Sequence, residues 1–382
     1  MVRGLLVEGW RGISHSYALV NQAQLLHLAG DQRFRLYHRD IELFQPHWRV
    51  VTAGFGEEER ARIAALEPPP AGFAADVIYR VSYPLRIFPV PGARVFVFGT
   101  TEWGALQRGD VLGSLAADGS LNGDGVHLVT PSSWSKVGLT NSGFRDDHVH
   151  VVPLGFDART FRPGSAEERA RLRSALGLPP DAFIFLSVGA MTWNKGIGPL
   201  LAAFAIHRRR NPQSRLVLKG ADAMYGRNLD HALAEVRHLA PGVWNREAAA
   251  GVTYIGSNLT RAELTGLFQA SDAYVTSYRA EGFSLPSLEA LGCGLPVIAT
   301  RGGPTDDFCP DRLCLKIEAN LRPMRNGLRF FDPSIESIVA CMQSAVDDEA
   351  LRARAAVEGS AWAAQNHSWS KVTQSLAGLL YG

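Results

Sequence analysis

Short apolar runs alternate with longer segments of mixed character along most of this chain. The runs are rich in Val, Ile, Leu and Phe, which is typical of buried strands. Segments between them, such as 17–28 and 261–270, place apolar residues at helical spacing. This repeated order of strand and helix predicts an α/β protein with parallel sheets. The predicted strands lie at 4–7, 34–37, 49–52, 76–81, 93–98, 127–130, 149–152, 183–188, 215–218, 252–256, 273–277 and 295–300.

Length and composition favour an ordinary globular protein. A chain of 382 residues is long enough for two domains of usual size. Hydrophobic residues make up 46% and charged residues 20%, which indicates packed cores rather than disorder. The formal net charge of +2 does not favour a nucleic-acid partner. The dipeptide Pro163-Gly164 is typical of a hinge between two domains.

The cysteines and the apolar segments indicate where the protein works. The four cysteines (Cys293, Cys309, Cys314 and Cys341) include no CxxC pair, which favours reduced thiols over disulfides or a zinc site. The apolar run at the N-terminus is too short for a signal peptide, and no stretch approaches the ~20 apolar residues of a membrane span. We therefore expect a cytoplasmic protein, and peripheral contact with the inner face of the membrane stays open.

One stretch concentrates the candidate chemistry. A β-prone segment at 273–277 is followed by a loop with Glu281 and by a short helix that contains Glu289. Pro286 suits the first turn of this helix, and Ser284 suits its N-cap. Free N–H groups at such a helix start, beside the carboxyl end of a parallel strand, predict an anion site. A glutamate in a mostly apolar helix needs hydrogen-bond donors, and sugar hydroxyls are suitable donors.

The run EGFSLPSLEALGCGLPV, which begins at Glu281, resembles the signature of a known enzyme family. That family is family 4 of the retaining, nucleotide-sugar glycosyltransferases with the GT-B fold. The resemblance implies that Glu281 meets the hydroxyls of the donor sugar and that Glu289 meets the ribose of the nucleotide. Without the resemblance, Glu289 would be a solvated helix charge and Glu281 a loop charge. The donor-binding residues that it implies between them are Gly282, Phe283, Ser284 and Leu285.

The same resemblance implies the domain organisation. GT-B proteins have two Rossmann-like domains whose parallel sheets face each other across a cleft. We expect an acceptor-binding N-terminal domain over 1–160 and a donor-binding C-terminal domain over 161–365. A final helix, about 366–382, is expected to cross back and complete the N-terminal domain. The segments 130–136 and 151–163 also resemble family segments, and the second of these ends the N-terminal domain.

A glycine-bearing turn at 189–196 is the candidate site for the donor diphosphate. It resembles the family segment G-R-L-x-x-x-K-G, in which an arginine and a lysine grip the diphosphate. Lys195 matches the lysine, whereas Ala190 stands where the arginine is expected. We expect another residue to supply the missing cation. Lys219 is our first choice, because it ends a strand of the same sheet, and Arg279 is the second.

A second glycine-bearing turn follows the first predicted strand. Family members carry a Gly-rich loop here that reaches toward the donor phosphates and the acceptor. The resemblance assigns Gly12 to donor binding, and Arg11 and His15 are the side chains of interest, with His15 a catalytic candidate. The alternative is that both side chains only cap or solvate the start of the following helix.

Residues at or after the ends of two further strands complete the candidate site. Many relatives place a histidine after the strand at 93–98, where this chain has Thr100, Thr101 and Glu102. Glu102 is therefore a catalytic candidate on the acceptor side, and a surface glutamate is the alternative. Tyr254 and Ile255 end a strand that lies beside the nucleotide base in relatives.

The resemblance implies a retaining glycosyltransferase. It would transfer a sugar from a nucleotide-diphosphate sugar to a hydroxyl of a glycan, a lipid-linked or a small-molecule acceptor, in polysaccharide, glycolipid or other glycoconjugate biosynthesis. No D-x-D cluster suited to a metal-bound diphosphate is present, so we expect no cofactor and no metal. Two alternatives stay open: a non-catalytic nucleotide-sugar-binding protein, which the missing arginine suggests, and an epimerase or phosphorylase of the same fold.

Overall fold

The structure is a computed structural model that describes residues 2–45, 48, 54–107, 109–112 and 125–382. The chain forms two compact units. Unit 1 comprises Met1–Gly155, Arg325–Leu328 and His367–Gly382, and unit 2 comprises Phe156–Met324 and Arg329–Asn366. The predicted strand at 49–52 lies outside the described residues.

Unit 1 is built on a parallel six-stranded sheet of order β2-β1-β3-β5-β7-β8. Its central strands are apolar on both faces, as expected for a sheet that helices cover on both sides, and Leu5, Val77, Val95 and Leu128 are fully buried. Near its edge, Leu85–Arg86 (β4) pairs in parallel with Val111–Leu112 (β6). The strands of the sheet are Phe34–Asp40 (β2), Arg3–Gly9 (β1), Val77–Val81 (β3), Arg94–Phe98 (β5), Val126–Thr130 (β7) and Val149–Val151 (β8).

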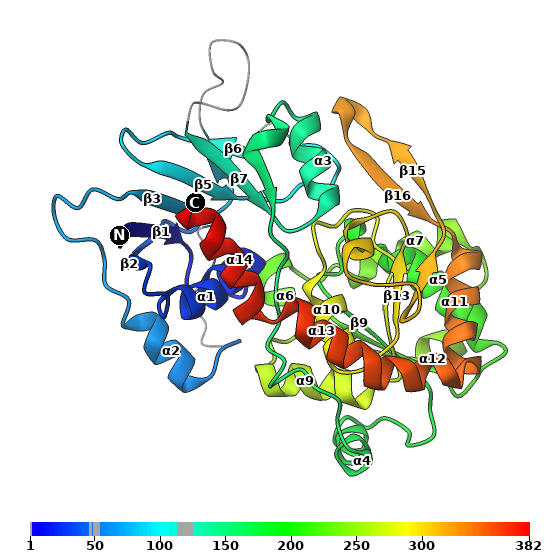
Figure 1. The fold of residues 1–382 in the computed structure, drawn as a ribbon. Coiled ribbons are helices and arrows are strands. Elements are labelled where there is room, and N and C mark those ends of the chain that lie inside the picture. Colours follow the sequence, from blue (N-terminus) through cyan, green and yellow to red (C-terminus); the bar gives the residue numbers. More distant parts are fainter. Residues whose placement is uncertain (1, 46–47, 49–53, 108, 113–124) are drawn as a thin grey trace. The chain divides into compact units, whose positions relative to one another are not determined.

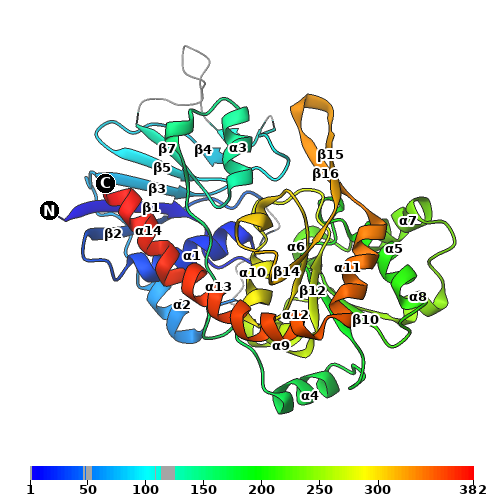
Figure 2. The ribbon, with the colours of Figure 1, turned by 45° about the vertical axis from the view of Figure 1, so that its right-hand side comes forward.

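The last helix of the chain belongs to unit 1. Helix α14 (Trp369–Tyr381) lies beside α1 (Ser16–Leu28) in both ribbon views (Figures 1 and 2). Its apolar face, which includes Val372 and Leu376, is buried. The other helical segments of this unit are α2 (Glu57–Ala64), α3 (Ser133–Asn141), η1 (Asp146–His148) and η4 (Arg325–Gly327).

Unit 2 is built on a second parallel sheet, of order β11-β10-β9-β12-β13-β14. The chain begins this sheet at β9, adds β10 and β11 on one side, and then adds β12 on the other side. The gap between β9 and β12 is therefore the topological switch point, where open α/β sheets bind ligands at the carboxyl ends of their strands. The strands are Val252–Ile255 (β11), Arg215–Lys219 (β10), Ile184–Val188 (β9), Ala273–Thr276 (β12), Val297–Thr300 (β13) and Cys314–Ile317 (β14).

Helix α5 (Ile197–Arg208) is the central helix of unit 2. Leu200, Leu201 and Phe204 are fully buried, because α5 belongs to the core that the sheet shares with α7 (Leu229–Leu239) and α11 (Ile335–Asp347). The remaining helical segments are α4 (Ala166–Ala175), η2 (Trp193–Lys195), α6 (Asp222–Tyr225), α8 (Arg246–Ala250), α9 (Arg261–Ala270), α10 (Leu285–Gly292), η3 (Pro304–Asp307), α12 (Glu349–Arg354), the π-helix η5 (Ala355–Gly359) and α13 (Ser360–His367).

An antiparallel hairpin interrupts the α/β order of unit 2. Strands β15 (Ala319–Pro323) and β16 (Arg329–Pro333) pair between β14 and α11, and the sequence analysis did not predict them. Figure 2 shows this hairpin projecting from the rest of unit 2. Leu321 and Met324 on it are exposed, so its pattern lacks the apolar run that indicates a buried strand.

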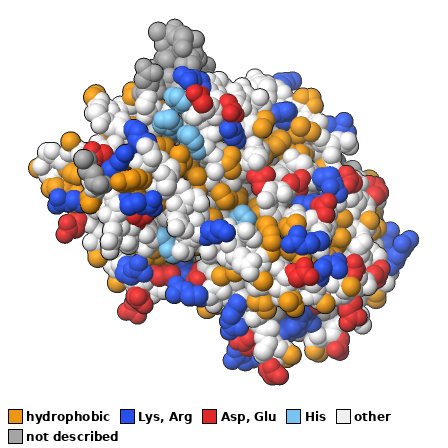
Figure 3. Space-filling view, in the orientation of Figure 1, with side chains coloured by type: hydrophobic (Ala, Val, Ile, Leu, Met, Phe, Trp, Pro, Cys, Tyr) orange, Lys and Arg blue, Asp and Glu red, His pale blue; other side chains and the backbone are white. Residues whose placement is uncertain are grey.

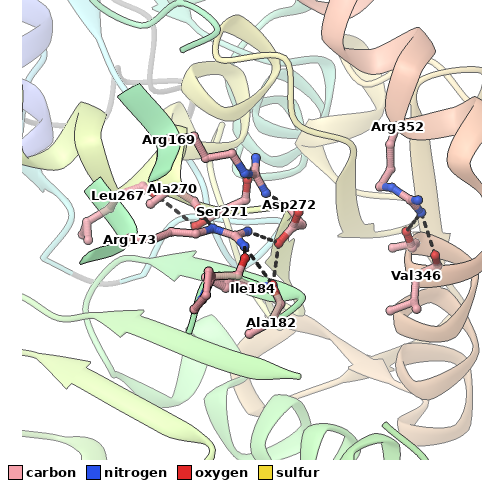
Figure 4. Close-up of polar contacts among 12 residues, drawn as sticks. Arg169, Arg173, Ala182, Ile184, Leu267, Ala270, Ser271, Asp272, Val346 and Arg352 are labelled. Atoms are coloured by element: carbon pink, nitrogen blue, oxygen red, sulfur yellow. Dashed lines mark hydrogen bonds and ion pairs between the residues drawn. The ribbon is translucent and has the colours of Figure 1, made fainter. Parts of the chain in front are cut away.

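A buried arginine, Arg173, and a partly exposed one, Arg169, pair with Asp272 at the amino ends of strands of the unit 2 sheet (Figure 4). Asp272, directly before β12, accepts hydrogen bonds from Arg173 Nη2 (2.6 Å) and from the N–H of Ile184 (2.7 Å), and it also pairs with Arg169. These arginines come from α4, so the cluster ties α4 to the amino ends of β9 and β12. Apart from this cluster in Figure 4, Arg352 donates to the carbonyl oxygen of Val346 (2.6 Å) at the end of α11.

The surface carries charges of both signs. On the face seen in Figure 3, Lys and Arg side chains lie among Asp and Glu side chains rather than in one basic field, in keeping with the net charge of +2. Among the described helices, none combines the length and the apolar character that a membrane crossing requires.

Candidate donor site

The switch point of unit 2 brings two loops together. Strands β9 and β12 are paired neighbours, with Phe185 opposite Ala273 and Leu186 opposite Tyr274. The carboxyl ends of parallel strands meet at the same edge of a sheet. The turn 189–196, which follows β9, therefore meets the loop 277–284, which follows β12.

The turn after β9 needs its glycine at position 196. Gly196 has a left-handed backbone (φ 66°), and a Cβ there would lie 1.8 Å from the carbonyl oxygen of Ser277. The Ser277 hydroxyl in turn donates to the carbonyl oxygen of Gly196 (2.8 Å). The carbonyl oxygen of Asn194 accepts from the N–H groups of Arg279 (2.7 Å) and Ala280 (3.1 Å). The two loops are thus joined backbone to backbone.

This joining places Lys195 against Glu281. The Nζ atom of Lys195 lies 2.9 Å from Oε2 of Glu281, and the side chains are 22% and 14% exposed. The other carboxylate oxygen of Glu281 accepts from the N–H of Gly282 (2.9 Å). The two residues expected to hold the diphosphate and the sugar are therefore in direct contact.

The start of α10 differs from the expectation in one respect. Pro286 lies in the first turn, as predicted, and Ser284 occupies the N-cap position. However, the Ser284 side chain makes no capping hydrogen bond, because its hydroxyl pairs with Ser287 Oγ (2.7 Å). Ser284 has φ 76°, which is costly for a residue with a side chain. Within the described residues, no protein group accepts from the N–H of Ser284 or Leu285.

Two further residues of the signature, Phe283 and Glu289, are buried or partly buried. The ring of Phe283 stacks on Phe308 with centroids 4.6 Å apart. Glu289, on α10, is partly buried, and burial raises the pKa of its carboxyl group from 4.5 to about 7, with Arg261 acting in the opposite direction. No side chain or backbone group in the described chain donates a hydrogen bond to this carboxylate. A solvated helix charge would not show this shift, so the structure disfavours that alternative.

The two candidates for the missing cation have different surroundings. Lys219, at the carboxyl end of β10, is buried, and its Nζ donates to the carbonyl oxygen of Gly220. Burial lowers the pKa of Lys219 below its usual range, while Asp222 opposes this shift. Arg279 is also buried, but it is engaged by Glu235, with Nη2 to Oε1 at 2.6 Å.

The predicted base-side residues lie at the ends of the next strands. The hydroxyl of Tyr254 donates to Asp222, and its ring packs against Gly220, where a Cβ would lie 2.3 Å from the Tyr254 oxygen. Burial, followed by the contact with Asp222, raises the pKa of Tyr254 to about 12. Ile255 ends β11, and its carbonyl oxygen accepts from the N–H of Gly220 (2.8 Å).

The candidates near the N-terminus belong to unit 1. Gly12 has a left-handed backbone (φ 72°), and its N–H donates to Oε1 of Gln22 (3.1 Å). His15 is the N-cap of α1, where its Nδ1 accepts from the N–H of Tyr17 (3.2 Å). Burial lowers the pKa of His15 to about 4, so the ring is uncharged at neutral pH. His15 therefore caps α1 in this structure, and its catalytic role stays a prediction.

Two more candidates of unit 1, Arg11 and Glu102, make contacts within that unit. Arg11 pairs with Asp40, with Nε to Oδ1 at 2.8 Å, and donates to the carbonyl oxygen of Ile63 (2.8 Å). Glu102, after β5, is partly buried, and its carbonyl oxygen accepts from the indole N–H of Trp134 (3.1 Å). The structure brings neither residue together with Lys195 or Glu281 within one unit.

Three contributors to the site were missed in the sequence. Asn194 and Ser277 join the two loops through their backbone and hydroxyl atoms, and Glu235 holds Arg279. Backbone carbonyl groups are the same in every residue, so their contacts cannot be predicted from the sequence. Glu235 has the sequence context of an ordinary charged residue on a helix surface. Among the described residues, no group of three or more His, Cys, Asp or Glu is placed to hold a metal ion.

Comparison with known proteins decides the family. The profile of the family described as glycosyl transferases group 1 matches residues 168–362, which is about half of the chain and contains Lys195, Glu281 and Glu289. The chain belongs to this family. It is 26% identical over 250 residues to mannosylfructose-phosphate synthase of Agrobacterium fabrum, covering 64% of this chain and 50% of that protein.

A second relative gives the same picture. D-inositol 3-phosphate glycosyltransferase of Segniliparus rotundus is 31% identical over 202 residues, covering 52% of this chain and 42% of that protein. The chain thus spans about half the length of the curated relatives it matches.

Solved structures of other proteins share the fold of this group 1 member. The Anabaena protein HepE, in complex with UDP-glucose, has a TM-score of 0.70 at 16% identity and 99% coverage of both chains. Sucrose-phosphate synthase from Thermosynechococcus elongatus has a TM-score of 0.61 at 18% identity, covering 99% of this chain and 98% of that chain. The predicted GT-B fold with two Rossmann-like parts is therefore confirmed.

Proposed function

We propose that this group 1 transferase moves a sugar from a nucleotide-diphosphate sugar to an acceptor hydroxyl, with retention at the anomeric carbon. One observation carries the proposal: Lys195 and Glu281 meet at the switch point of the unit 2 sheet, 2.9 Å apart. A cation and a carboxylate at this point suit a ligand that presents both phosphate oxygens and sugar hydroxyls. Unit 2 then binds the donor and unit 1 the acceptor.

The donor would enter by replacing the ion pair with ligand contacts. Glu281 would accept hydrogen bonds from sugar hydroxyls, and Lys195 would move to the diphosphate. The N–H groups of Ser284 and Leu285, at the start of α10, face no protein acceptor and suit the same anion. Glu289 would accept from the ribose hydroxyls, and such donors favour its charged form.

The energetic task is to stabilise the leaving group. As the bond between the anomeric carbon and the phosphate oxygen breaks, negative charge develops on the nucleoside diphosphate. Preorganised N–H groups and ammonium groups stabilise that charge without reorganisation. We propose that Lys195 and Lys219 do this without a metal ion. The proton of the acceptor hydroxyl passes to the leaving phosphate on the same face of the sugar, so that no side-chain base is required.

The names of the relatives bear on the substrates. Mannosylfructose-phosphate synthase and D-inositol 3-phosphate glycosyltransferase are named for phosphorylated small molecules, and HepE was solved with UDP-glucose. We propose a nucleotide-sugar donor, with an acceptor that is a small molecule, a glycan or a lipid-linked glycan in glycoconjugate biosynthesis. The four cysteines are buried free thiols, which supports work in the cytoplasm, with contact to the inner membrane face for a lipid-linked acceptor.

The experiment has two stages. A thermal-shift screen of nucleoside diphosphates and their sugars identifies the donor, because a ligand that binds only the folded state raises the melting temperature. The purified protein is then incubated with that donor and a panel of acceptors. We expect acceptor-dependent release of nucleoside diphosphate, and an anomeric proton coupling in the product that matches the donor.

The same experiment separates the alternatives. Binding without release against the whole acceptor panel would identify a non-catalytic nucleotide-sugar-binding protein. A reaction that requires inorganic phosphate would identify a phosphorylase, and a change in the donor's sugar without transfer would identify an epimerase. Any of these three results would overturn the proposed transfer.

A further inference from the structure

We infer that Arg279 is a positioning residue that holds Lys195 in place through Glu235 and Trp193, and that it is not a ligand of the diphosphate. The inference rests on the proposed function for the role of Lys195 alone. The placement of the turn around Lys195 is a property of unit 2 and can be measured without any reaction.

Backbone contacts first tie Arg279 to the turn that carries Lys195. The N–H of Arg279 donates to the carbonyl oxygen of Asn194 at 2.7 Å. The carbonyl oxygen of Arg279 accepts from the N–H of Phe331, on β16, at 2.8 Å. Arg279 therefore lies between the turn after β9 and the hairpin, two residues before Glu281.

The guanidinium group completes the attachment. Its carbon lies 4.3 Å from the centroid of the Trp193 ring, and Nη1 donates to the carbonyl oxygen of Trp193 (3.2 Å). Nη2 and Nη1 donate to the two carboxylate oxygens of Glu235, on α7, at 2.6 and 3.2 Å. The planar guanidinium group can make all of these contacts together. Its face stacks on the Trp193 ring, and the N–H groups at its edge donate the hydrogen bonds. The buried guanidinium group of Arg279 thus contacts both the ring and the backbone of Trp193.

The same contacts leave Arg279 unable to act as a phosphate ligand. Its side chain is only 4% exposed, and its negative partner is already in place. The one nitrogen that lacks a partner, Nε, is itself buried. Reaching a diphosphate would require breaking the pair with Glu235, which would leave a partly buried carboxylate, 21% exposed, without its cation. Lys195 is more exposed, at 22%, than Arg279.

The hairpin adds a second hold on the same tryptophan. Trp193 is 45% exposed, and its ring lies 5.2 Å from the ring of Phe330, on β16. The turn 193–196 is therefore held both by α7, through Arg279, and by the hairpin, through Phe330. A small shift of this turn would move Lys195 away from Glu281, and a misplacement of about 1 Å can cost on the order of 100-fold in rate.

The test compares both partners of the ion pair. If Arg279 positions Lys195, Arg279→Ala, Glu235→Ala and the double variant should all lower kcat by on the order of 100-fold, to within a few-fold of one another. The KM for the donor should change much less, because Glu289 is untouched. Arg279→Lys should not rescue kcat, since lysine lacks the fork. Arg312→Ala, which removes an exposed pair with Glu358, is the matched control.

A ligand role for Arg279 would give a different pattern. Glu235→Ala would then retain the parental kcat, and Arg279→Lys would restore much of the activity, because lysine binds phosphate well as a point charge. Either result would overturn the inference.

A second measurement keeps the inference separate from the reaction. Hydrogen exchange over residues 190–197 should speed up in Arg279→Ala and Glu235→Ala but not in Arg312→Ala, with unchanged exchange in β9. If no transfer is found but this exchange pattern holds, the proposed function fails and the positioning role stands. Unchanged exchange in the two variants would refute the positioning role whatever the activity.

Discussion

Lys195 and Glu281 are 86 positions apart in the chain, and their side chains lie 2.9 Å from each other. The contact arises because β9 and β12 are neighbours in the sheet although β10 and β11 intervene in sequence. In this ion pair, each residue neutralises the charge of the other. A donor that carries both diphosphate and hydroxyl groups can take over both partners at once, so the pair favours a ligand of that composition.

Removal of the Lys195 ammonium should slow the chemical step. We expect Lys195→Ala to lower kcat by on the order of 100-fold or more, comparable to the loss of one preorganised donor, because charge on the diphosphate is greatest as the sugar leaves. Steady-state kinetics with the donor found in the thermal-shift screen would measure this. Lys371→Ala, at an exposed position of α14, is the control and should keep the parental rate. A Lys195→Ala enzyme with the parental kcat would refute the role.

Lys219 should act as the second cation in place of the arginine that Ala190 replaces. We expect Lys219→Ala to resemble Lys195→Ala in kcat, and we expect chelators to leave the activity of the parental enzyme intact. Rates with and without EDTA, for the parent and the variant, check both points. Parental activity in Lys219→Ala would mean that Lys195 and backbone N–H groups alone stabilise the negative charge of the leaving diphosphate. Loss of activity with EDTA would contradict the metal-free mechanism.

The Glu289 carboxyl group should make stability depend on pH. Its pKa is raised from 4.5 to about 7 by burial, so between these values the folded state keeps a proton that the unfolded state has lost. Stability should therefore fall as pH rises from about 4.5 to about 7, by on the order of 3 kcal/mol. Urea unfolding at several pH values would measure this for the parent and for Glu289→Gln, which cannot titrate. Parallel pH profiles of the two proteins would rule out the shift.

Asp272 offers a stability test away from the donor site. Asp272→Asn leaves Arg173 and Arg169 without their carboxylate at the amino ends of β9 and β12. Breaking a buried pair costs about 3 kcal/mol or more, so the unfolding midpoint should fall clearly. Nucleoside diphosphate affinity should be unchanged below that midpoint. A variant as stable as the parent would mean that the cluster contributes little.

The strand order and the main site residues could be predicted because they leave local signals. Apolar runs followed by glycine-bearing turns marked β9 and β12, and the signature from Glu281 identified the loop that faces Lys195. The ends of most elements were also close: the helix predicted at 17–28 is Ser16–Leu28, and that at 261–270 is Arg261–Ala270.

The parts that could not be predicted depend on tertiary contacts. An arginine in a loop looks available for a phosphate, and only the structure shows that α7 supplies Glu235 to Arg279. Ser284 looks like a capping residue, yet its left-handed backbone turns its hydroxyl to Ser287. The hairpin of β15 and β16 has exposed apolar residues and several arginines, a pattern that resembles a loop.

The most direct test of the donor site is the affinity of Glu289→Ala for a nucleoside diphosphate. Titration calorimetry with the diphosphate that stabilises the parental protein measures ribose recognition without any acceptor. The loss of a charged hydrogen-bond partner is worth roughly 1.5–3 kcal/mol, which corresponds to a Kd about 10- to 100-fold weaker. We predict a loss of that size in Glu289→Ala and parental affinity in Lys371→Ala. An unchanged Kd in Glu289→Ala would contradict the placement of the nucleotide in unit 2.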